Sequence, residues 1–361
     1  MKSYNHLFEI ALSEPVRRKA VHNVTLGRKN SSAAKRFAEH EETNIRASYN
    51  WILNYKNSEH TPMKINDGTS RKVRTIVVPT LPELTVQHCV VQALLPMFYH
   101  GMYEHSYASI PGRGSHKGKK VIEKWIRNDS KNCKYIIKMD IRHFFESIPH
   151  DKLKAKLAKH IHDDKMLDLI YKIIDITEEG LPLGFYTSQW FSNWYLQDLD
   201  HYIKEDLQAS HYIRYMDDMV IFGSNKRRLH QIRKDIEKYL KTEMGLSLKN
   251  NWQVFRFAYI KNGKEYGRDL DFMGFRFYRN RTVLRKSIMY RATRKAKKVG
   301  KKEKPTIYDI RQMLSYFGWL DCTDTYCVYF YYIKPYVDFQ KCKRRISNYD
   351  KRRIKEVIYD N

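Results

Sequence analysis

Two short apolar segments around a tight Met-Asp-Asp turn constrain the fold of this chain more than any other feature. Residues 211–215 (HYIRY) and 219–223 (MVIFG) have the β-branched, aromatic and apolar composition of strands. Asp217 and Asp218 form the turn between them, so one carboxylate at least lies at a sheet edge. The sequence therefore predicts a sheet whose edge carries acidic side chains.

The segments around this unit predict an α+β fold. Residues 134–141 form a further strand that ends around Asp140. Residues 187–207 and 226–246 have helical periodicity, and the second helix ends at Gly245 as a C-cap. The order strand, helix, hairpin, helix, strand is typical of an antiparallel sheet with helices on one face.

The remaining segments are predicted to be mainly helical. Residues 1–60 are polar and helical, and residues 81–103 form a helix that opens at Pro82. Residues 67–80 form a hairpin, with an Asp-Gly pair as its turn. A Thr-x-x-Asp capping box begins a helix over residues 306–320, which has an apolar stripe.

Three aspartates carry the predicted chemistry. Asp140 ends one strand and Asp217 and Asp218 join two others, so an antiparallel sheet can bring all three together. Converging carboxylates repel one another unless cations bridge them, and hard oxygen ligands favour Mg²⁺. The alternative is that aspartate simply favours turns, which accounts for Asp217 and Asp218 but not for Asp140.

The charge of the chain predicts a polyanionic partner. Lys and Arg number 67 against 40 acidic residues, which gives a net charge of +27, and the chain contains 27 Tyr, 16 Phe and 6 Trp. Rings interleaved with cations suit stacking on bases, so nucleic acid is the expected partner; solubility alone is the alternative. Ten of the 20 residues 285–304 are basic, which indicates either a solvated face or an arm that grips a nucleic-acid backbone.

Composition also excludes several classes of protein. The five cysteines form no CxxC pair, which argues against a zinc ribbon or a disulfide framework and fits a reducing compartment. The sequence has no secretory h-region and no apolar stretch long enough to span a membrane. We therefore expect a cytoplasmic protein without a membrane partner.

Five segments occur in the order of the palm motifs of reverse transcriptases, and the chain resembles that family. They are 134–150 (KYIIKMDIRHFFESIPH), 181–200 (LPLGFYTSQWFSNWYLQDLD), 212–223 (YIRYMDDMVIFG), 245–251 (GLSLKNN) and 270–278 (LDFMGFRFY). Two earlier segments, RKVRTIVVP and SYASIPGRG, are similar to the fingers motifs. The resemblance implies a right-hand polymerase: N-terminal helices and fingers in 1–125, palm in 126–280, and a basic arm and helical thumb in 281–361. It also implies that no RNase H, integrase or endonuclease follows the thumb.

The resemblance assigns roles position by position. It implies that Asp140, Asp217 and Asp218 are catalytic and bind two Mg²⁺ ions, for which Mn²⁺ can substitute. The positions that match dNTP contacts are Arg74, Lys72, Phe145, Leu183, Gly184 and Gln189. Phe145 matches the steric gate against a ribose 2′-hydroxyl; the alternative is that Phe144 and Phe145 both belong to the core.

Further positions match the primer and template contacts of the family. Lys249 matches a proton donor to pyrophosphate, and Phe272, Met273 and Gly274 resemble the primer grip. Contacts with the template or the nucleic-acid backbone are expected from Arg113, Arg294, Lys295, Lys297 and Lys298. The implied partners are template RNA, the RNA–DNA hybrid and dNTPs.

Two departures from the common pattern indicate a lineage. Leu183 stands where most reverse transcriptases have Gln, and Gln189 where they have Pro, as in the enzymes of diversity-generating retroelements. Those enzymes are bacterial or phage-encoded, copy an RNA with errors opposite adenine, and work with a small, basic, oligomeric accessory protein. We hypothesise that Leu183 lacks the polar check that a Gln amide would make on the nascent base pair; the alternative is that Leu183 only packs the pocket.

Other functions stay open. The chain is also similar to group II intron, retron and phage-defence reverse transcriptases, which a nearby adenine-variable repeat in the genome would distinguish. An RNA-dependent RNA polymerase would need room for a 2′-hydroxyl, which Phe145 opposes. A non-catalytic RNA-binding protein would not require all three carboxylates.

Overall fold

The computed structural model describes residues 3–26, 28, 31–66 and 73–359, with side chains as far as residue 351. The chain forms two compact units, the first of residues 1–114 and 135–254, the second of residues 115–134 and 255–361. These two units do not coincide with the predicted fingers, palm and thumb, whose boundaries after residues 125 and 280 come from the sequence motifs. Each unit contains residues from more than one of those expected segments.

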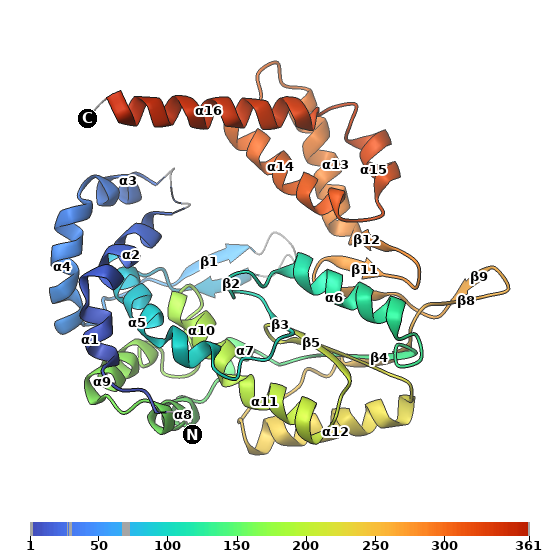
Figure 1. Cartoon of the computed structure of the whole chain (residues 1–361), viewed down its shortest axis with the longest axis horizontal. Helices are drawn as coiled ribbons and strands as arrows, with labels where there is room; N and C mark the ends of the chain where they lie inside the picture. The colour runs from blue at the N-terminus through green and yellow to red at the C-terminus, as the bar shows by residue number, and fades with distance from the viewer. Residues whose placement is uncertain (1–2, 27, 29–30, 67–72, 360–361) are drawn as a thin grey trace. The chain divides into compact units, whose positions relative to one another are not determined.

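Helices dominate the N-terminal part of the first unit, as the sequence predicts (Figure 1). They are α1 (Leu7–Leu12), α2 (Glu14–Thr25), α3 (Ser32–Glu39), α4 (Glu41–Leu53) and α5 (Leu81–Tyr99). Thr80 and Glu83 form a capping box at the start of α5, in which the Glu83 carboxylate accepts the Thr80 amide at 2.8 Å. The helix ends at Tyr99, short of the predicted residue 103, and Gly101 continues the chain with a left-handed φ of 72°.

A small hairpin precedes α5. Strand β1 (Met63–Asn66) pairs antiparallel with β2 (Val73–Ile76). The predicted Asp-Gly turn, at 67–68, lies outside the described residues. The hairpin therefore begins four residues earlier than the predicted range of 67–80.

The central sheet of the first unit has five strands in the order β3-β5-β6-β4-β7. They are β3 (Ser106–Tyr107), β4 (Tyr135–Asp140), β5 (His211–Tyr215), β6 (Asp218–Gly223) and β7 (Gln253–Arg256). β6 pairs antiparallel with both β4 and β5, as predicted. β3 pairs parallel with β5, so the sheet is mixed and the expectation of a fully antiparallel sheet is corrected.

Seven further helical segments belong to the first unit. They are α7 (Phe144–Ser147), α8 (His150–His160), α9 (Asp164–Ile174), α10 (Tyr186–Tyr195), α11 (Gln197–His201), a π-helical segment (Tyr202–Asp206) and α12 (Lys226–Thr242). The prediction that residues 187–207 are helical is confirmed, but the segment breaks at Leu196 between α10 and α11 and ends in π geometry. α12 packs against β4 and β6, and Figure 1 shows α11 and α12 on the same side of the sheet.

The end of α12 differs from the prediction for a physical reason. The helix stops at Thr242, and Gly245 follows with a φ of 66°. A Cβ on Gly245 would lie 2.7 Å from Cγ of Pro149, so glycine is needed for this close contact as well as for its left-handed backbone. The Leu246 amide then closes the turn on the Leu240 carbonyl at 2.8 Å.

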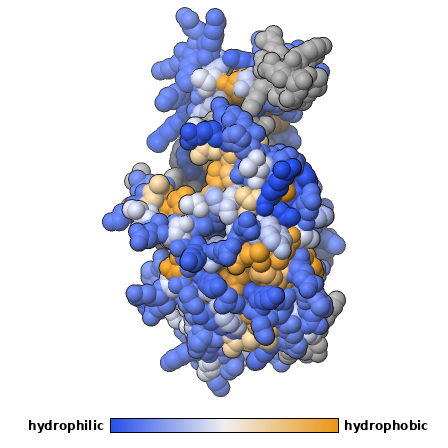
Figure 2. All heavy atoms as spheres, turned by 90° about the vertical axis from the view of Figure 1, so that its left-hand side faces the viewer, coloured by the Kyte–Doolittle hydropathy of each residue, from blue (hydrophilic) through white to orange (hydrophobic). Residues whose placement is uncertain are grey.

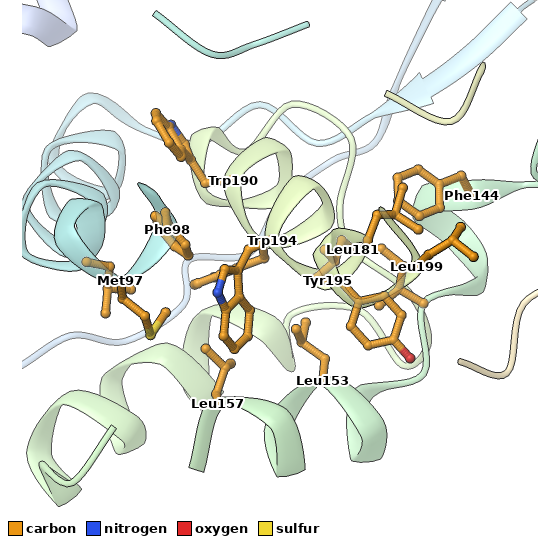
Figure 3. Close-up of a cluster of buried hydrophobic side chains, with 14 of the residues drawn as sticks. Met97, Phe98, Phe144, Leu153, Leu157, Leu181, Trp190, Trp194, Tyr195 and Leu199 are labelled. Carbon is orange, nitrogen blue, oxygen red and sulfur yellow. The ribbon is translucent and has the colours of Figure 1, made fainter. Parts of the chain in front are cut away.

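Aromatic and aliphatic side chains from α5, α8 and α10 meet in the core of the first unit (Figure 3). The Phe98 ring stacks on Trp190 with centroids 5.5 Å apart. Trp194 packs beneath them beside Leu153 and Leu157, and all five side chains are almost completely buried. This core fixes α10, which follows directly after the predicted dNTP-binding segment.

The second unit combines small sheets with helices. Its elements are α6 (Ser115–Asn128), β8 (Tyr259–Lys261), β9 (Lys264–Tyr266), β10 (Leu270–Phe272), β11 (Phe275–Phe277), β12 (Thr282–Leu284), α13 (Lys286–Gly300), α14 (Ile307–Asp321), α15 (Tyr326–Tyr332) and α16 (Phe339–Tyr359). The capping box predicted for α14 is present, with the Asp309 amide donating to Thr306 Oγ1 at 3.1 Å. α13 packs against both α14 and α15 (Figure 1).

The surface of the chain is largely hydrophilic. Figure 2 shows the side of the molecule that includes the N-terminal helices, where charged and polar residues surround several apolar areas. Exposed apolar side chains on these helices and the chain that follows them include Ile10, Leu26 and Leu53. In the part of the chain that the structure describes, no helix has the length and apolar content to cross a membrane.

Candidate active site

Asp140 and Asp218 are direct cross-strand partners. Asp140 is the last residue of β4 and Asp218 the first of β6, and the antiparallel register pairs their Cα atoms. Directly opposite side chains in such a pair lie about 5 Å apart at Cβ. Asp217 precedes Asp218 in the turn from β5. The three predicted aspartates therefore gather where β4 ends and β6 begins, at one end of the central strands.

The electrostatics of this edge are unfavourable for three unscreened anions. Burial and the neighbouring charge of Asp140 raise the pKa of Asp217 to about 7, and Asp218 adds to this effect. Asp140 Oδ1 is buried and accepts no hydrogen bond from any described residue. The site therefore has oxygen ligands in excess of the protein groups that could neutralise them.

Lys249 is the cation that the fold brings to Asp140. Its Nζ forms an ion pair with Asp140 Oδ2, and its amide donates to the Asp140 carbonyl at 2.8 Å. The neighbouring bridge between Ile141 and Leu248 holds the two segments in this register. The structure thus places the predicted Lys249 side chain at the Asp140 carboxylate.

The donor set fits a divalent cation in part. Among the described residues, no group of three or more His, Cys, Asp and Glu side chains is arranged as a ready-made metal cluster. Asp140 and Asp217 nevertheless bring carboxylate oxygens together, and one of these oxygens, Asp140 Oδ1, has no hydrogen-bond partner within the part of the chain that the structure describes. Hard oxygen ligands with uncompensated charge are what Mg²⁺ prefers.

Arg214 fixes the turn that carries Asp217, and sequence reasoning missed it. Its buried guanidinium binds both carboxylate oxygens of Asp200 at 2.8 and 2.6 Å. The same group donates to the Met216 carbonyl at 3.0 Å and to Asn193 Oδ1 at 3.1 Å. Met216 has a φ of 55°, an uncommon value for a residue other than glycine, and its conformation depends on these contacts.

The signal that could have identified this network is the single charged residue in an otherwise apolar strand. Arg214 is 1% exposed and Asp200 is fully buried, and a buried charge needs a partner. Asp200 also accepts the Tyr212 hydroxyl at 2.7 Å. The pairing of α11 with β5 is long-range, so the sequence alone does not name Asp200 as that partner.

Four of the six predicted dNTP-binding residues belong to two connected segments. Arg74 is exposed on β2, while Lys72 lies outside the described residues. The amide of Val77 donates to the Leu183 carbonyl at 2.7 Å. Gly184 has a φ of 113°, and a Cβ there would lie 2.1 Å from the Val77 carbonyl oxygen. The strand that bears Arg74 is thus tied to the Leu183–Gly184 segment by a contact that only glycine permits.

Phe145 and Gln189 lie on short helices of the same unit. Phe144 is buried and Phe145 is half-buried, with ring centroids 5.4 Å apart. One phenylalanine therefore belongs to the core and the other reaches the surface. Gln189 is exposed on α10.

The predicted primer-grip residues form the turn between β10 and β11. Phe272 is buried, Met273 and Gly274 both have positive φ, and a Cβ on Gly274 would lie 2.9 Å from the Trp319 ring. The turn therefore packs closely on α14 within the second unit.

The predicted backbone-binding residues differ in how free their side chains are. Arg294, Lys297 and Lys298 are exposed on α13, so the predicted basic arm is a helix in this region. Lys295 instead forms an ion pair with the buried Asp309 at 2.8 Å. Arg113 donates to the Tyr103 carbonyl at 2.7 Å, within the loop that it stabilises.

Comparisons with known proteins agree on a family. The sequence model of the family described as "Reverse transcriptase (RNA-dependent DNA polymerase)" matches residues 63–277. This range contains the three aspartates, Lys249 and the segment around Leu183.

Individual relatives are distant. The chain is 26% identical over 204 residues to the retron Ec73 reverse transcriptase of Escherichia coli, covering 53% of this chain and 62% of that protein. It is 28% identical over 152 residues to the group II intron-encoded protein LtrA of Lactococcus lactis subsp. cremoris, covering 39% and 24%. The chain therefore spans less than two-thirds of the length of these relatives. Among solved structures, apo telomerase from Candida tropicalis aligns with a TM-score of 0.48 and 12% identity over 76% of this chain and 62% of that chain.

Proposed function

Because the chain belongs to the reverse transcriptase family, we propose that it is an RNA-directed DNA polymerase that copies a template RNA into cDNA. The proposed reaction joins a dNTP to a primer 3′-hydroxyl and releases pyrophosphate. The observation that carries the proposal is Asp140 opposite Asp218 across β4 and β6, with Asp217 in the adjoining turn. This juxtaposition of carboxylates is what nucleotidyl transfer with divalent cations requires.

The family implies the use of a divalent metal, and we assign two Mg²⁺ ions to Asp140 and Asp217, with Asp218 in support. When bound, the ions activate the 3′-hydroxyl and stabilise the leaving pyrophosphate. Counting only the residues that the structure describes, one carboxylate oxygen of Asp140 has no partner and the other pairs with Lys249, so Asp140 can accept a cation without losing its lysine. The Lys249 ammonium holds the proton that the pyrophosphate takes up. Mn²⁺, with a similar preference for oxygen ligands, is the expected substitute.

The substrate contacts follow from the same assignment. Arg74 on β2 binds the triphosphate, a role that suits its planar and permanently charged group. Phe145 excludes the ribose 2′-hydroxyl, and Gly184 allows close approach of the backbone to the nascent pair. We assign fingers to residues 1–125, palm to 126–280 and thumb to 281–361.

The nucleic acid would be gripped mainly through its phosphates. Arg294, Lys297 and Lys298 are exposed on α13, and phosphate contacts of this kind make binding strongly salt-dependent. Phe272, Met273 and Gly274 would hold the primer end. The nucleic-acid partners are then template RNA and the RNA–DNA hybrid.

For the lineage, we propose a diversity-generating retroelement, with adenine-directed errors and a small, basic, oligomeric accessory protein as partner. Leu183 and Gln189 support this assignment. A retron or group II intron enzyme is the second candidate, since the relatives named above belong to those two groups.

Sequencing of cDNA made on an RNA template tests the lineage. The parent chain, with Mg²⁺ and four dNTPs, is expected to give errors concentrated opposite template adenines. Accurate cDNA would keep the polymerase and favour the retron or intron lineage. If no cDNA forms even with a candidate accessory protein and its cognate RNA present, the chain is a non-catalytic RNA-binding protein.

A further inference from the structure

A group of exposed aromatic side chains lies on α15 of the second unit, and none of these side chains has been given a role above. Tyr326, Phe330, Tyr331 and Tyr332 are 69%, 40%, 67% and 54% exposed. We call these four residues the aromatic platform. None of the seven residues of α15 is buried.

The platform does not serve the core of its unit. α15 is held by its flanks, where Thr325 and Ile333 are buried. The inward ring of the helix is Tyr329, which stacks on Phe339 with centroids 5.8 Å apart. The four platform rings are therefore left at the surface, and three of them, Tyr326, Phe330 and Tyr331, contact one another in series. A surface group of apolar rings of this kind usually marks a binding site.

The platform rings are arranged with their faces and hydroxyls available. Tyr326 stacks on Phe330 at 5.8 Å, and Tyr331 stands edge-on to Phe330 at 5.4 Å. Among the described residues, none forms a hydrogen bond with the hydroxyl of Tyr326, Tyr331 or Tyr332. The Lys334 ammonium lies 4.8 Å from the Phe330 centroid, so a cation sits beside the rings.

The charge around the platform favours an anionic partner. Residues 321–345 contain five Lys or Arg and three acidic residues, Asp321, Asp324 and Asp338. The Asp324 carboxylate accepts the main-chain amide of Thr282 at 2.8 Å. The Asp338 carboxylate accepts the main-chain amides of Gln340 and Lys341 at 2.9 and 3.1 Å, so it serves the start of α16. Aromatic faces interleaved with uncompensated cations are the features that bind single-stranded nucleic acid without sequence preference.

We propose that the aromatic platform binds a single-stranded RNA segment, with bases stacked on the tyrosine rings and phosphates near Lys334. RNA as the partner rests on the proposed function; the platform itself is a site additional to the polymerase centre. A protein partner would have to be strongly acidic to tolerate this surface, and the chain's net charge of +27 favours RNA.

Fluorescence anisotropy with a short, unstructured, labelled RNA tests this site in the full chain. Replacing Tyr326, Tyr331 and Tyr332 together by alanine should weaken RNA binding about tenfold or more. Replacing the same three by phenylalanine keeps the rings and should retain affinity. Tyr49→Ala is the matched control, because Tyr49 on α4 is 44% exposed with Arg17 over its ring but does not belong to the platform. The RNA affinity of this variant should equal that of the parent.

Equal RNA affinity of the alanine variant and the parent would overturn the proposal and make the platform a protein-docking surface. Circular dichroism checks that the variant is folded, which is expected because α15 buries no side chain. Primer extension by the parent chain is measured separately. A parent that binds RNA through the rings but extends no primer contradicts the proposed function alone, whereas extension without ring-dependent binding contradicts this inference alone.

Discussion

The guanidinium of Arg214 donates a hydrogen bond of 3.0 Å to the main-chain carbonyl of Met216, the residue just before Asp217. Arg214 is itself fixed by a two-pronged ion pair with Asp200, and both side chains are buried. The position of the Asp217 carboxylate therefore depends on an ion pair between β5 and α11. Arg214 acts through the turn and is a positioning residue.

Arg214→Lys should lower the rate of nucleotide addition ten- to hundredfold while leaving the KM for dNTP nearly unchanged. Lysine keeps a charge for Asp200 but loses the planar fork that also reaches Met216, and small displacements of catalytic groups are costly. Single-turnover primer extension measures the rate, and we expect a stability loss of about 2 kcal/mol.

Arg276→Lys is the matched control, because Arg276 forms a similar two-pronged ion pair with Asp269 at 2.7 and 2.8 Å. It should leave the rate unchanged. An Arg214→Lys variant that is folded and as fast as the parent would mean that the turn does not depend on this arginine.

Gly184→Ala should raise the KM for dNTP and destabilise the first unit. The added Cβ would lie 2.1 Å from the Val77 carbonyl, on a backbone whose φ of 113° already excludes most side chains, so β2 and Arg74 must move. Steady-state kinetics measures the KM, and urea unfolding measures the stability.

Gly318→Ala is the control. Gly318 lies in α14, and a Cβ there would meet no atom within 4 Å, so the substitution should be neutral or stabilise the protein by up to about 1 kcal/mol. An unchanged KM for dNTP in Gly184→Ala would mean that the position of β2 does not affect nucleotide binding.

Asp217→Asn should stabilise the metal-free protein at pH 8 by up to about 4 kcal/mol. The pKa of Asp217 is about 7 in the folded state, and its ordinary value is 3.8. At a pH between these two values, the carboxyl is protonated in the folded state and ionised in the unfolded state. Stability of the parent thus falls as the pH rises from about 4 to about 7, and the advantage of the variant grows over that range and then levels off. Urea unfolding in EDTA at several pH values measures it; a variant no more stable than the parent at pH 8 would contradict the repulsion inferred at this edge.

Leu183→Gln should lower misincorporation opposite template adenine. Leu183 is half-buried and offers no polar group beyond its backbone, whereas a Gln amide could penalise a badly shaped pair. Leu183→Met, which conserves volume and polarity, should keep the parent's error spectrum. Deep sequencing of cDNA compares the three proteins, and an identical spectrum in Leu183→Gln would leave Leu183 as a packing residue only.

Local patterns predicted much of this fold. The three strands β4, β5 and β6 follow from short apolar runs, and the capping box of α14 follows from Thr306 and Asp309 at fixed spacing. The convergence of Asp140 with Asp217 follows from strand ends in an antiparallel sheet. These features depend on neighbours in sequence or on a single pairing.

What the sequence did not predict depends on contacts between distant segments. β3 has only two residues, too few for any periodicity, and pairs parallel with β5. The break between α10 and α11 falls at Leu196, a fully buried residue, and nothing in the local sequence pattern marks it. The tie between Val77 and Gly184 and the partner of Arg214 each require the assembled first unit.

The most direct test of the account is primer extension on an RNA template by Asp140→Asn. Of the three predicted catalytic aspartates, only Asp140 lies outside the Met-Asp-Asp turn. It lies opposite Asp218 in the sheet, so the proposed centre depends on it. We expect extension with Mg²⁺ to fall about a thousandfold or more. The control Asp168→Asn, an exposed residue of α9 paired only with Lys172 among the described residues, should extend like the parent. Extension by a folded Asp140→Asn at the parent's rate would contradict the assignment of nucleotidyl transfer to these carboxylates.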